Sequence, residues 1–461
     1  MGPIKKLFCR KHRGAALVIS MIFVLVFSAL AVSMATQSGT NLQIAENQRK
    51  GDCARACAES GVEIIRFWLS RFAVVGATDP GLVLNELAIP ASVNSLQFDL
   101  TENSITNIRT SYDGTTLTIP SVTLDSANSK SFSAEITQLG PDALQMDVTG
   151  VYQTMTRTIR ANYDFGIRRR TVFDYGVATK GPLRLAGNIE LEGVNVNVES
   201  DVYIVSDNDL MALEITGNSS IAGDVHISNP LATYDLQGGQ ASIGGETLPE
   251  ADEHVTTGYG DVEFPVPNPG YFEQYVVEDI NLTETTFVNV RIPPNTDPCF
   301  SAGITLLGIV FIEAPNVVTF SGNVNITGII VGNGDINDDS GTNQINFLGT
   351  VSSNPVTDLP EEFGDLRDET GTFLMAPGFS LSFGGNFETI NGAIAANGIT
   401  FSGDAGGTIE GSVLNYSDSP MVFSGNSDLS FNRWANTEIP AGFEPDIVLH
   451  YDSTSYSEGP F

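Results

Sequence analysis

The feature that most constrains this chain is a run of 21 residues, Ala15 to Ala35, without a charged side chain. Its polar members are Ser20, Ser28 and Ser33. About 20 residues at 1.5 Å per residue span the hydrocarbon layer of a bilayer, so a helix of this length can cross a membrane. A secretory signal has a shorter apolar core of about 7 to 15 residues. The run therefore predicts a membrane-spanning helix.

Basic residues gather before this run, at Lys5, Lys6, Arg10, Lys11 and Arg13. Positive charge flanking a membrane helix stays on the cytoplasmic side. We expect a single-pass membrane protein with its N-terminus in the cytoplasm. The rest of the chain then lies on the other side of the membrane.

The helical pattern continues beyond the apolar run, because Thr40 to Phe72 contains no proline. Apolar residues recur there at steps of three and four, which places them in one stripe on a helix; they are Ala54, Ala58, Gly61, Val62, Ile65, Leu69 and Phe72. Residues 15–72 are thus predicted to form one helix of 58 residues, roughly 87 Å long. The stripe can pack on the chain's own sheet. It can also pack on neighbouring helices, since small residues allow close approach.

The segments "RGAALVISMIFVLVFSALAVSMAT" and "LQIAENQRKGDCARACAESGVE" resemble the N-terminal region of PilX-type minor pilins. The matching positions are Ala45, Asn47, Gln48, Arg49, Ala54, Ala58, Glu59, Ser60 and Gly61. The resemblance implies that residues 1–14 are a leader, which a prepilin peptidase removes by cutting between Gly14 and Ala15. It also implies that the bared helix joins other pilin-like subunits in a type IV filament or a secretion pseudopilus. The membrane would then be the inner membrane, and the rest of the chain would lie in the periplasm or on an extracellular filament.

Two positions depart from the pilin pattern. Ala15 stands where the family usually has Phe or Met, and Ile19 stands where most members have Glu at the fifth mature position. In the family that Glu neutralises the amine of a neighbouring subunit inside an apolar environment, where an unpaired charge is costly. Its replacement by Ile19 favours a minor subunit at the filament tip or in an initiation complex.

Residues 80–166 alternate polar and apolar side chains in short runs separated by turn signals. The runs are "SLQFDL", "TTLTIPSVTL", "SFSAEITQL", "ALQMDVTGVY" and "MTRTIRANYDF". Asp113-Gly114 and Gly140-Pro141-Asp142 are typical turn sequences. The region predicts a small antiparallel sheet that buries its apolar face against the helix.

The chain changes composition near Lys180, its last lysine, and then repeats Gly-Asn-x-x-Leu/Ile-x-Gly. Three copies begin at Gly187, Gly217 and Gly322, with looser copies at Gly385, Gly403 and Gly425. Gly and Asn tolerate the positive φ of coil corners, and stacked coils share one core. Residues 172–461 are therefore predicted to form a parallel β-solenoid; a β-sandwich is the alternative.

Some stretches of this region have assignments of their own. The run "VNVNV", residues 194–198, is assigned to a wall of the solenoid. Prolines indicate insertions near residues 246–300 and 354–370. The predicted class is thus α+β and mainly β, with a long N-terminal helix, a small antiparallel sheet and the solenoid.

Asp335, Asn337 and Asp339 have the 1, 3, 5 spacing of a calcium loop. Ser340 replaces the glycine of such a loop and Asn346 replaces its bidentate glutamate. Because the strongest ligand is missing, a polar turn without metal is favoured and no cofactor is predicted; calcium is the alternative.

Cys53 and Cys57 lie four residues apart on the predicted helix. Their Cβ atoms would be about 5 to 6 Å apart, whereas a disulfide needs about 3.8 Å. Buried free thiols are therefore the preferred interpretation. A bridge from either one to Cys299 stays open.

The formal charge of −33, with 22 Lys and Arg, argues against a nucleic-acid partner, because polyanions would be repelled. The sequence also lacks GxSxG, HExxH and phosphate-loop motifs. We predict a minor pilin or pseudopilin-like subunit, not an enzyme, which displays an acidic solenoid for adhesion or assembly. A surface polysaccharide or a protein would be its ligand. The alternative is a membrane-tethered, carbohydrate-active β-solenoid enzyme.

Overall fold

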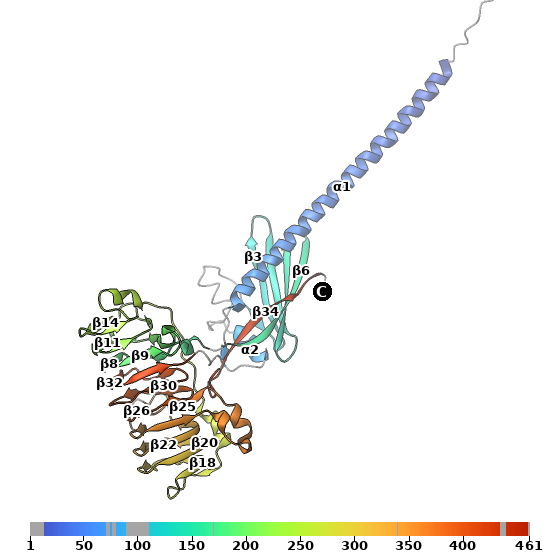
Figure 1. Cartoon of the computed structure of the whole chain (residues 1–461). Helices are drawn as coiled ribbons and strands as arrows, with labels where there is room; N and C mark the ends of the chain where they lie inside the picture. Colours follow the sequence, from blue (N-terminus) through green and yellow to red (C-terminus); the bar gives the residue numbers. More distant parts are fainter. Residues whose placement is uncertain are drawn as a thin grey trace, which may run out of the picture. The chain divides into compact units, whose positions relative to one another are not determined.

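The computed structural model of the chain describes residues 13–70, 74–75, 80–88, 110–168, 170–338, 340–433 and 439–459. The chain divides into two compact units (Figure 1). The N-terminal unit consists of residues 1–166 and 447–461, and the solenoid unit consists of residues 167–446. The solenoid unit is therefore inserted in the sequence of the first. Our assignment of residues 172–461 to the solenoid was wrong at its end, because the C-terminal strand belongs to the N-terminal unit.

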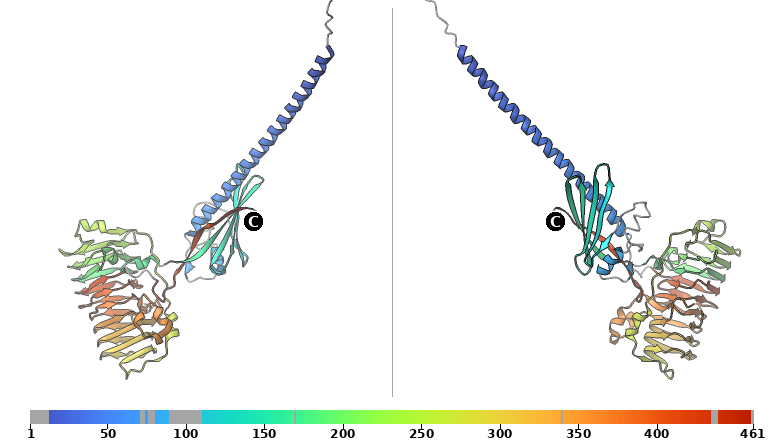
Figure 2. Two further views of the ribbon diagram at one scale, coloured as in Figure 1. Left: turned by 45° about the vertical axis from the view of Figure 1, so that its right-hand side comes forward. Right: turned by 180° about the vertical axis from the view of Figure 1, so that it is seen from behind.

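Helix α1, Arg13–Ser70, is continuous over 58 residues, as its proline-free sequence predicts. Every residue from Ala16 to Arg49 is exposed, whereas buried residues recur from Gly51 onward. The two views in Figure 2 show the later part of α1 lying along the antiparallel sheet and the earlier part extending beyond it. Among the described residues, α1 is the one helix long and apolar enough to cross a membrane.

The antiparallel sheet of the N-terminal unit has the strand order β1-β34-β6-β5-β4-β3-β2. The strands are β1 (Val74–Val75), β2 (Ser111–Tyr112), β3 (Thr116–Asp125), β4 (Lys130–Gln138), β5 (Ala143–Tyr152), β6 (Met155–Arg168) and β34 (Asp446–Gly459). Strands β3 to β6 coincide with four of the five predicted runs, and their pairing is antiparallel. The fifth run, "SLQFDL", lies outside the described residues. A short helix, α2 (Pro80–Ala88), adds buried leucines to the same core.

Three parallel sheets form the walls of the solenoid unit. The first sheet contains β16 (Val255–Thr257), β13 (Val225–Ile227), β10 (Val202–Ile204), β7 (Val177–Thr179), β31 (Val413–Asn415), β28 (Ala393–Ala396), β25 (Thr372–Ala376), β22 (Val324–Asn333), β20 (Ile304–Glu313), β18 (Thr286–Ile292) and β17 (Glu278–Asp279), in that order, with β24 (Val351–Asn354) beside β22. The second contains β14 (Thr233–Gln237), β11 (Met211–Gly217), β8 (Leu183–Gly187), β32 (Met421–Gly425), β29 (Ile399–Phe401), β26 (Ser380–Phe383), β23 (Gln344–Phe347), β21 (Val317–Phe320) and β19 (Cys299–Phe300). The third contains β15 (Ser242–Ile243), β12 (Ser220–Ile221), β9 (Glu190–Gly193), β33 (Asp428–Phe431), β30 (Gly407–Ile409) and β27 (Thr389–Ile390). This parallel pairing confirms the predicted solenoid and not the β-sandwich.

The coils are not stacked in the order of the sequence. A first run, β7 to β16, winds away from the middle of the solenoid, and a second run, β17 to β33, starts at the opposite end and winds back. The last coil then pairs with the first, as in Val413 with Val177 and Leu429 with Leu191. Figure 1 shows the result as colours, since the red β32 lies beside the green β8.

The core of the second run contains a column of stacked phenylalanines, one from each coil of the second sheet. Adjacent rings are 4.9 to 5.2 Å apart between centroids and lie within 12° of parallel; the residues are Phe300, Phe320, Phe347, Phe383, Phe401 and Phe423. In the first run the same register positions hold Leu185 and Ile215. The column is thus aromatic in one run and aliphatic in the other.

The Gly-Asn repeats form a corner of the solenoid, as their conformational freedom predicts. Gly187 has a φ of 137° and Gly217 a φ of 78°, and a side chain on Gly217 would come within 2.4 Å of the Gly187 carbonyl oxygen. The following asparagines stack, with Asn218 donating to Asn188 at 3.0 Å and Asn188 donating to Asn426 at 2.9 Å. The last of these bonds joins the two runs.

Two proline-marked segments cover the outside of the first solenoid sheet. Phe272 in η4 (Pro269–Tyr275) and Leu366 in η6 (Glu361–Asp368) are buried there in one cluster with strand residues such as Phe311. The stretch near 354–370 contains two short helices, η5 (Val356–Asp358) and η6. The predicted bounds of the insertion near 246–300 are too wide, because β17, β18 and β19 belong to the coils.

The assignment of residues 194–198 to a solenoid wall was also wrong. Val194, Val196 and Val198 are exposed, and part of the run forms η2 (Asn197–Ser200). The segment is a loop fixed by the buried carboxylate of Glu199, which accepts hydrogen bonds from the backbone N–H groups of Asn195 at 2.7 Å and Arg433 at 3.0 Å. The N–H of Val196 also donates to this carboxylate, at 3.3 Å, and is therefore not available to a neighbouring strand.

Candidate assembly helix and solenoid surfaces

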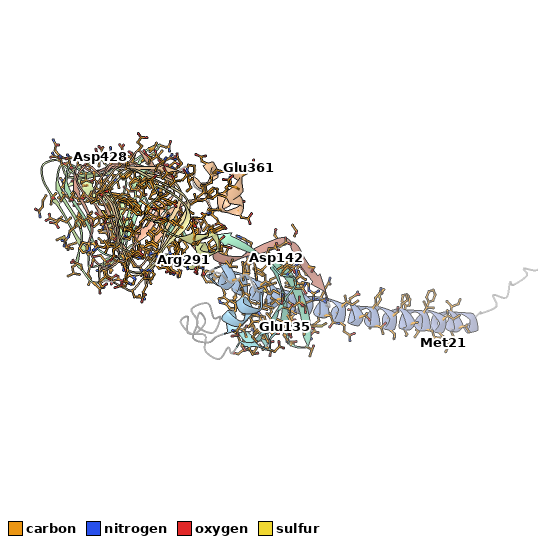
Figure 3. The ribbon with its side chains drawn as sticks, turned by 90° about the horizontal axis from the view of Figure 1, so that it is seen from below. Met21, Glu135, Asp142, Arg291, Glu361 and Asp428 are labelled. Atoms are coloured by element: carbon orange, nitrogen blue, oxygen red, sulfur yellow. The ribbon has the colours of Figure 1, made fainter. Side chains whose placement is uncertain are left out.

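The first part of α1 presents apolar side chains on all sides. Leu25 is 66% exposed and Phe27 is 65% exposed. Figure 3 shows the same for Met21, which projects from this part of the helix with no other element beside it. An apolar surface of this extent is stable only in a bilayer or against other apolar surfaces.

Three hydroxyl groups in this part of α1 donate hydrogen bonds within the helix. Ser20 donates to the Leu17 carbonyl at 2.8 Å, Thr36 to the Ser33 carbonyl at 2.8 Å, and Thr40 to the Thr36 carbonyl at 2.9 Å. Internal satisfaction of polar groups is what a helix needs inside a membrane or a filament core.

The charge pattern of α1 agrees with an apolar environment over its first part. Ile19 is exposed, and the first acidic residue of the chain is Glu46. Glu46 pairs with Lys50 at 2.9 Å. From Ala16 to Ala45 the helix therefore carries no carboxylate that could bind the amine of a neighbouring subunit.

The predicted packing stripe is used within the chain. Ala54, Ala58, Ile65 and Leu69 are fully buried, and so are Gly61 and Val62. They pack on β4 and β5 of the chain's own sheet in one core with Phe132 and Val148. The alternative that this stripe bundles with neighbouring subunits is not supported, because its surface is already occupied.

Glycines permit the close approach of α1 to the sheet. A side chain on Gly61 would lie 2.6 Å from the Phe132 ring, and one on Gly150 of β5 would lie 2.2 Å from the Ala54 carbonyl oxygen. The small residues in the stripe thus serve helix-to-sheet contact, which the sequence pattern alone did not distinguish from contact between helices.

The cysteines agree with the prediction of free thiols. Cys57 is buried beneath the sheet, Cys53 is partly buried, and Cys299 is exposed on the solenoid; all three are free. The bridge to Cys299 that the sequence left open is not formed.

The calcium candidates do not form a metal site among the described residues. Asp335 accepts hydrogen bonds from the backbone and the side chain of Asn337 at 2.9 and 3.1 Å, as in a polar turn. Asp339 lies outside the described residues. Over the ranges that the structure describes, no group of three His, Cys, Asp or Glu is placed to hold a metal ion.

The structure brings together a cluster of charged side chains that could not be recognised from the sequence. A hollow of about 560 Å³ in the solenoid unit is lined by Asp207, Asp261, Asp418 and Lys180. The Lys180 ammonium lies 5.4 Å from the centre of the Tyr416 ring. Complete burial raises the pKa of the Tyr416 hydroxyl, which donates to the Pro265 carbonyl at 2.7 Å. Lys180 thus lines the same hollow as three aspartates, and this hollow is a specific place to test the carbohydrate-active enzyme alternative.

The outward side of the second solenoid sheet differs between the runs. In the first run it carries Arg184, Glu214 and Asp235 in register, with Arg184 and Glu214 3.7 Å apart. In the second run the same row continues without any Asp, Glu, Lys, Arg or His; its residues are Cys299, Thr319, Asn346, Ser382, Thr400 and Val422. We call the outward side of β19, β21, β23, β26, β29 and β32 the neutral face.

Sequence reasoning missed the neutral face, although a signal for it exists. Phe-x-Gly recurs at Phe320, Phe347, Phe383 and Phe401, each at the end of its strand, and at Phe423 within β32. This repeat marks the aromatic column and therefore the strands whose opposite side forms the face.

Comparison with known proteins gives one family match, which lies within α1. Residues 13–63 match the family model described as PilX N-terminal. No curated protein matches the chain. The competence-associated pilin ComZ from Thermus thermophilus is 10% identical, with 89% of this chain and 97% of that chain covered and a TM-score of 0.29. An ice-binding protein domain from Shewanella frigidimarina is 9% identical, with 58% and 99% covered and a TM-score of 0.18. Residues 13–63 thus form a PilX-like type IV pilin N-terminus.

Proposed function

We propose that the protein is a minor pilin or pseudopilin-like subunit of a type IV filament or secretion system. The observation that carries this proposal is the PilX-like helix, whose exposed apolar part extends from a folded unit that does not cover it. Such a helix is held in the inner membrane before assembly and among the helices of other subunits afterwards. The solenoid unit is then displayed for adhesion or for assembly.

Processing is part of this proposal. A prepilin peptidase would cut between Gly14 and Ala15, after the leader with its five basic residues. The basic leader favours a cytoplasmic N-terminus, so that both compact units lie beyond the membrane. Removing the leader takes its charges away from the end of the apolar helix.

Ile19 supports a minor role. A subunit inside the shaft would need a carboxylate to neutralise its neighbour's amine in the apolar core. This chain has its first carboxylate at Glu46, so a place at the tip or in an initiation complex fits better.

The test is the mass of the N-terminal peptide, measured in cells with and without a prepilin peptidase. We expect a mature chain that begins at Ala15 in the first case and an unprocessed chain in the second. An uncut leader in both would contradict processing and would favour a plain membrane anchor.

The hollow at Lys180 gives the enzyme alternative a specific site to test. The assembly proposal expects neutral and acidic polysaccharides to remain uncut by the full-length protein. A release of reducing ends that is lost in Lys180→Ala and kept in Lys130→Ala would favour the enzyme.

A further inference from the structure

We infer that the neutral face binds the ordered surface of an insoluble, uncharged polysaccharide. This inference rests on the display role proposed above, since it names the ligand class of the displayed unit. Its test, however, needs neither processing nor a filament.

The charge of the face favours a neutral ligand. The chain has a formal charge of −33, yet the six strands of the neutral face contain no Asp, Glu, Lys, Arg or His. A cationic ligand would bind the acidic remainder of the surface, and an anionic one would be repelled by it. An uncharged ligand loses nothing by contact with this face.

The aromatic column makes the face flat. Neighbouring strands of a sheet are normally rotated by about 20 to 25°. Here Phe383, Phe401 and Phe423 differ by 8° and 3° from ring to ring, with centroids 5.1 and 4.9 Å apart. Because each ring is fixed to its own strand, near-parallel rings indicate nearly untwisted strands. The outward side chains therefore lie in straight rows with one residue per coil.

Most side chains in the central row of the face are small and polar, and Val422 at its end is apolar. Thr319, Asn346, Ser382 and Thr400 are partly exposed and offer hydroxyl or amide groups at successive coils. Hydroxyls beside them make long contacts with the preceding coil, from Ser402 to the Phe383 carbonyl at 3.4 Å and from Ser424 to the Phe401 carbonyl at 3.5 Å. Hydroxyls and amides both donate and accept hydrogen bonds.

These properties distinguish a polysaccharide surface from a protein partner. The centre of a protein interface usually contains Trp, Tyr or Arg, and the strands of the neutral face contain none of them. A single soluble sugar would need a concave site. A flat polymer surface instead allows many weak contacts to form together, which raises the overall affinity.

The first run serves as an internal comparison. Arg184, Glu214 and Asp235 occupy the same row there and hold their charges in water. Covering them would cost desolvation energy. We therefore expect the contact to end at β32.

The experiment uses the full-length protein in detergent with microcrystalline cellulose and chitin powders, and measures depletion from solution as a binding isotherm. We expect saturable binding to at least one powder. Thr400→Glu should weaken it about tenfold or more, because contact would bury an unpaired charge. The control is Thr408→Glu on β30, a partly exposed outward threonine of the same coil on the third sheet, which should bind as wild type.

A second variant, Ser382→Arg, tests whether a charge of the opposite sign has the same effect. Melting curves show that each variant is folded before its binding is compared. No binding to either powder, equal loss in Thr400→Glu and Thr408→Glu, or adsorption to ice without binding to polysaccharide would each overturn the inference. Because processing at Gly14 is measured separately, a failure here leaves the proposed assembly role standing.

Discussion

The N-terminal unit and the solenoid unit solve the problem of burying apolar residues in different ways. The solenoid unit buries its apolar residues between its own coils. Its last coil pairs with its first, and its second run contains a core of stacked phenylalanines. The N-terminal unit buries the stripe from Ala54 to Leu69 but leaves the helix bare from Ala16 to Arg49. The difference teaches that the uncovered apolar surface belongs to the N-terminal unit, whereas the coils of the solenoid unit bury their apolar side chains against one another.

The largest expected effect comes from removing the bare part of α1. Deletion of residues 15–39 should abolish association with membranes and with filaments, because no other described surface is comparably apolar. The solenoid unit should melt at an unchanged temperature. Fractionation of sheared filaments and calorimetry of the deleted protein would measure the two effects, and retained association would contradict the comparison.

A substitution in the column of stacked phenylalanines should lower the stability of the solenoid unit alone. Phe347→Ala removes a buried ring between Phe320 and Phe383 and should cost about 3 to 5 kcal/mol. Leu348→Ala is the matched control, because Leu348 is 53% exposed. Denaturant unfolding should show the loss in one transition only; a loss in both transitions would mean that the two units are not independent.

Replacing Gly150 in β5 should lower the stability of the N-terminal unit alone. Gly150→Ala places a methyl group within 2.2 Å of the Ala54 carbonyl oxygen and should cost about 1 to 3 kcal/mol. Gly140→Ala is the control, because the nearest atom to its new methyl group is 3.9 Å away, on Asp142. Unaltered unfolding of the Gly150→Ala protein would show that the helix does not approach the sheet this closely.

The smallest expected effect is the pH dependence of stability at Glu190, where the two runs of the solenoid meet. Burial, Glu192 and Asp428 raise the pKa of Glu190, which lies opposite Asp428 on the third sheet. A raised pKa in the folded state means that stability is greatest below the ordinary carboxyl pKa and falls as the pH rises through the folded value. Glu190→Gln should therefore stabilise the solenoid unit at pH 7, by a few tenths of a kcal/mol after solvent screening.

The same substitution should have little effect near pH 3, where the carboxyl group is protonated. Thermal melts at the two pH values test this difference. The effect of pH has the opposite sign at Asp113 in the N-terminal unit, because hydrogen bonds from Thr116 and Thr115 lower the pKa of its carboxyl group. The stability that Asp113 contributes is therefore lost on acidification. Equal responses of both units to acid would contradict the assignment.

Much of the fold could be predicted from the sequence, because its signals are local. The absence of proline in residues 15–72 and the alternation of β3 to β6 depend on neighbouring residues. The Gly-Asn corners do too, since Gly187 and Gly217 need positive φ whatever surrounds them. The stacking order of the coils is not local. Nothing near Val413 states that it pairs with Val177.

Two features of the candidate site were beyond local reasoning for the same cause. The stripe at Ala54 and Ala58 has the same composition whether it meets a sheet or another helix, and Gly150, far along the chain, decides between them. Lys180 and Asp418 line one hollow only because the two runs meet beside them. The neutral face, in contrast, could have been found from its Phe-x-Gly repeat.

The most direct test of the central claim is site-specific photo-crosslinking on α1 in cells that assemble filaments. A crosslinker at Leu25, which is exposed, should capture the N-terminal helix of another pilin-like subunit, and one at Ile65, which is buried, should react within the chain. Capture of a second subunit at Leu25 and not at Ile65 is the predicted result. Intersubunit products at Ile65 with none at Leu25 would contradict the claim that the bare part of α1 is the assembly surface.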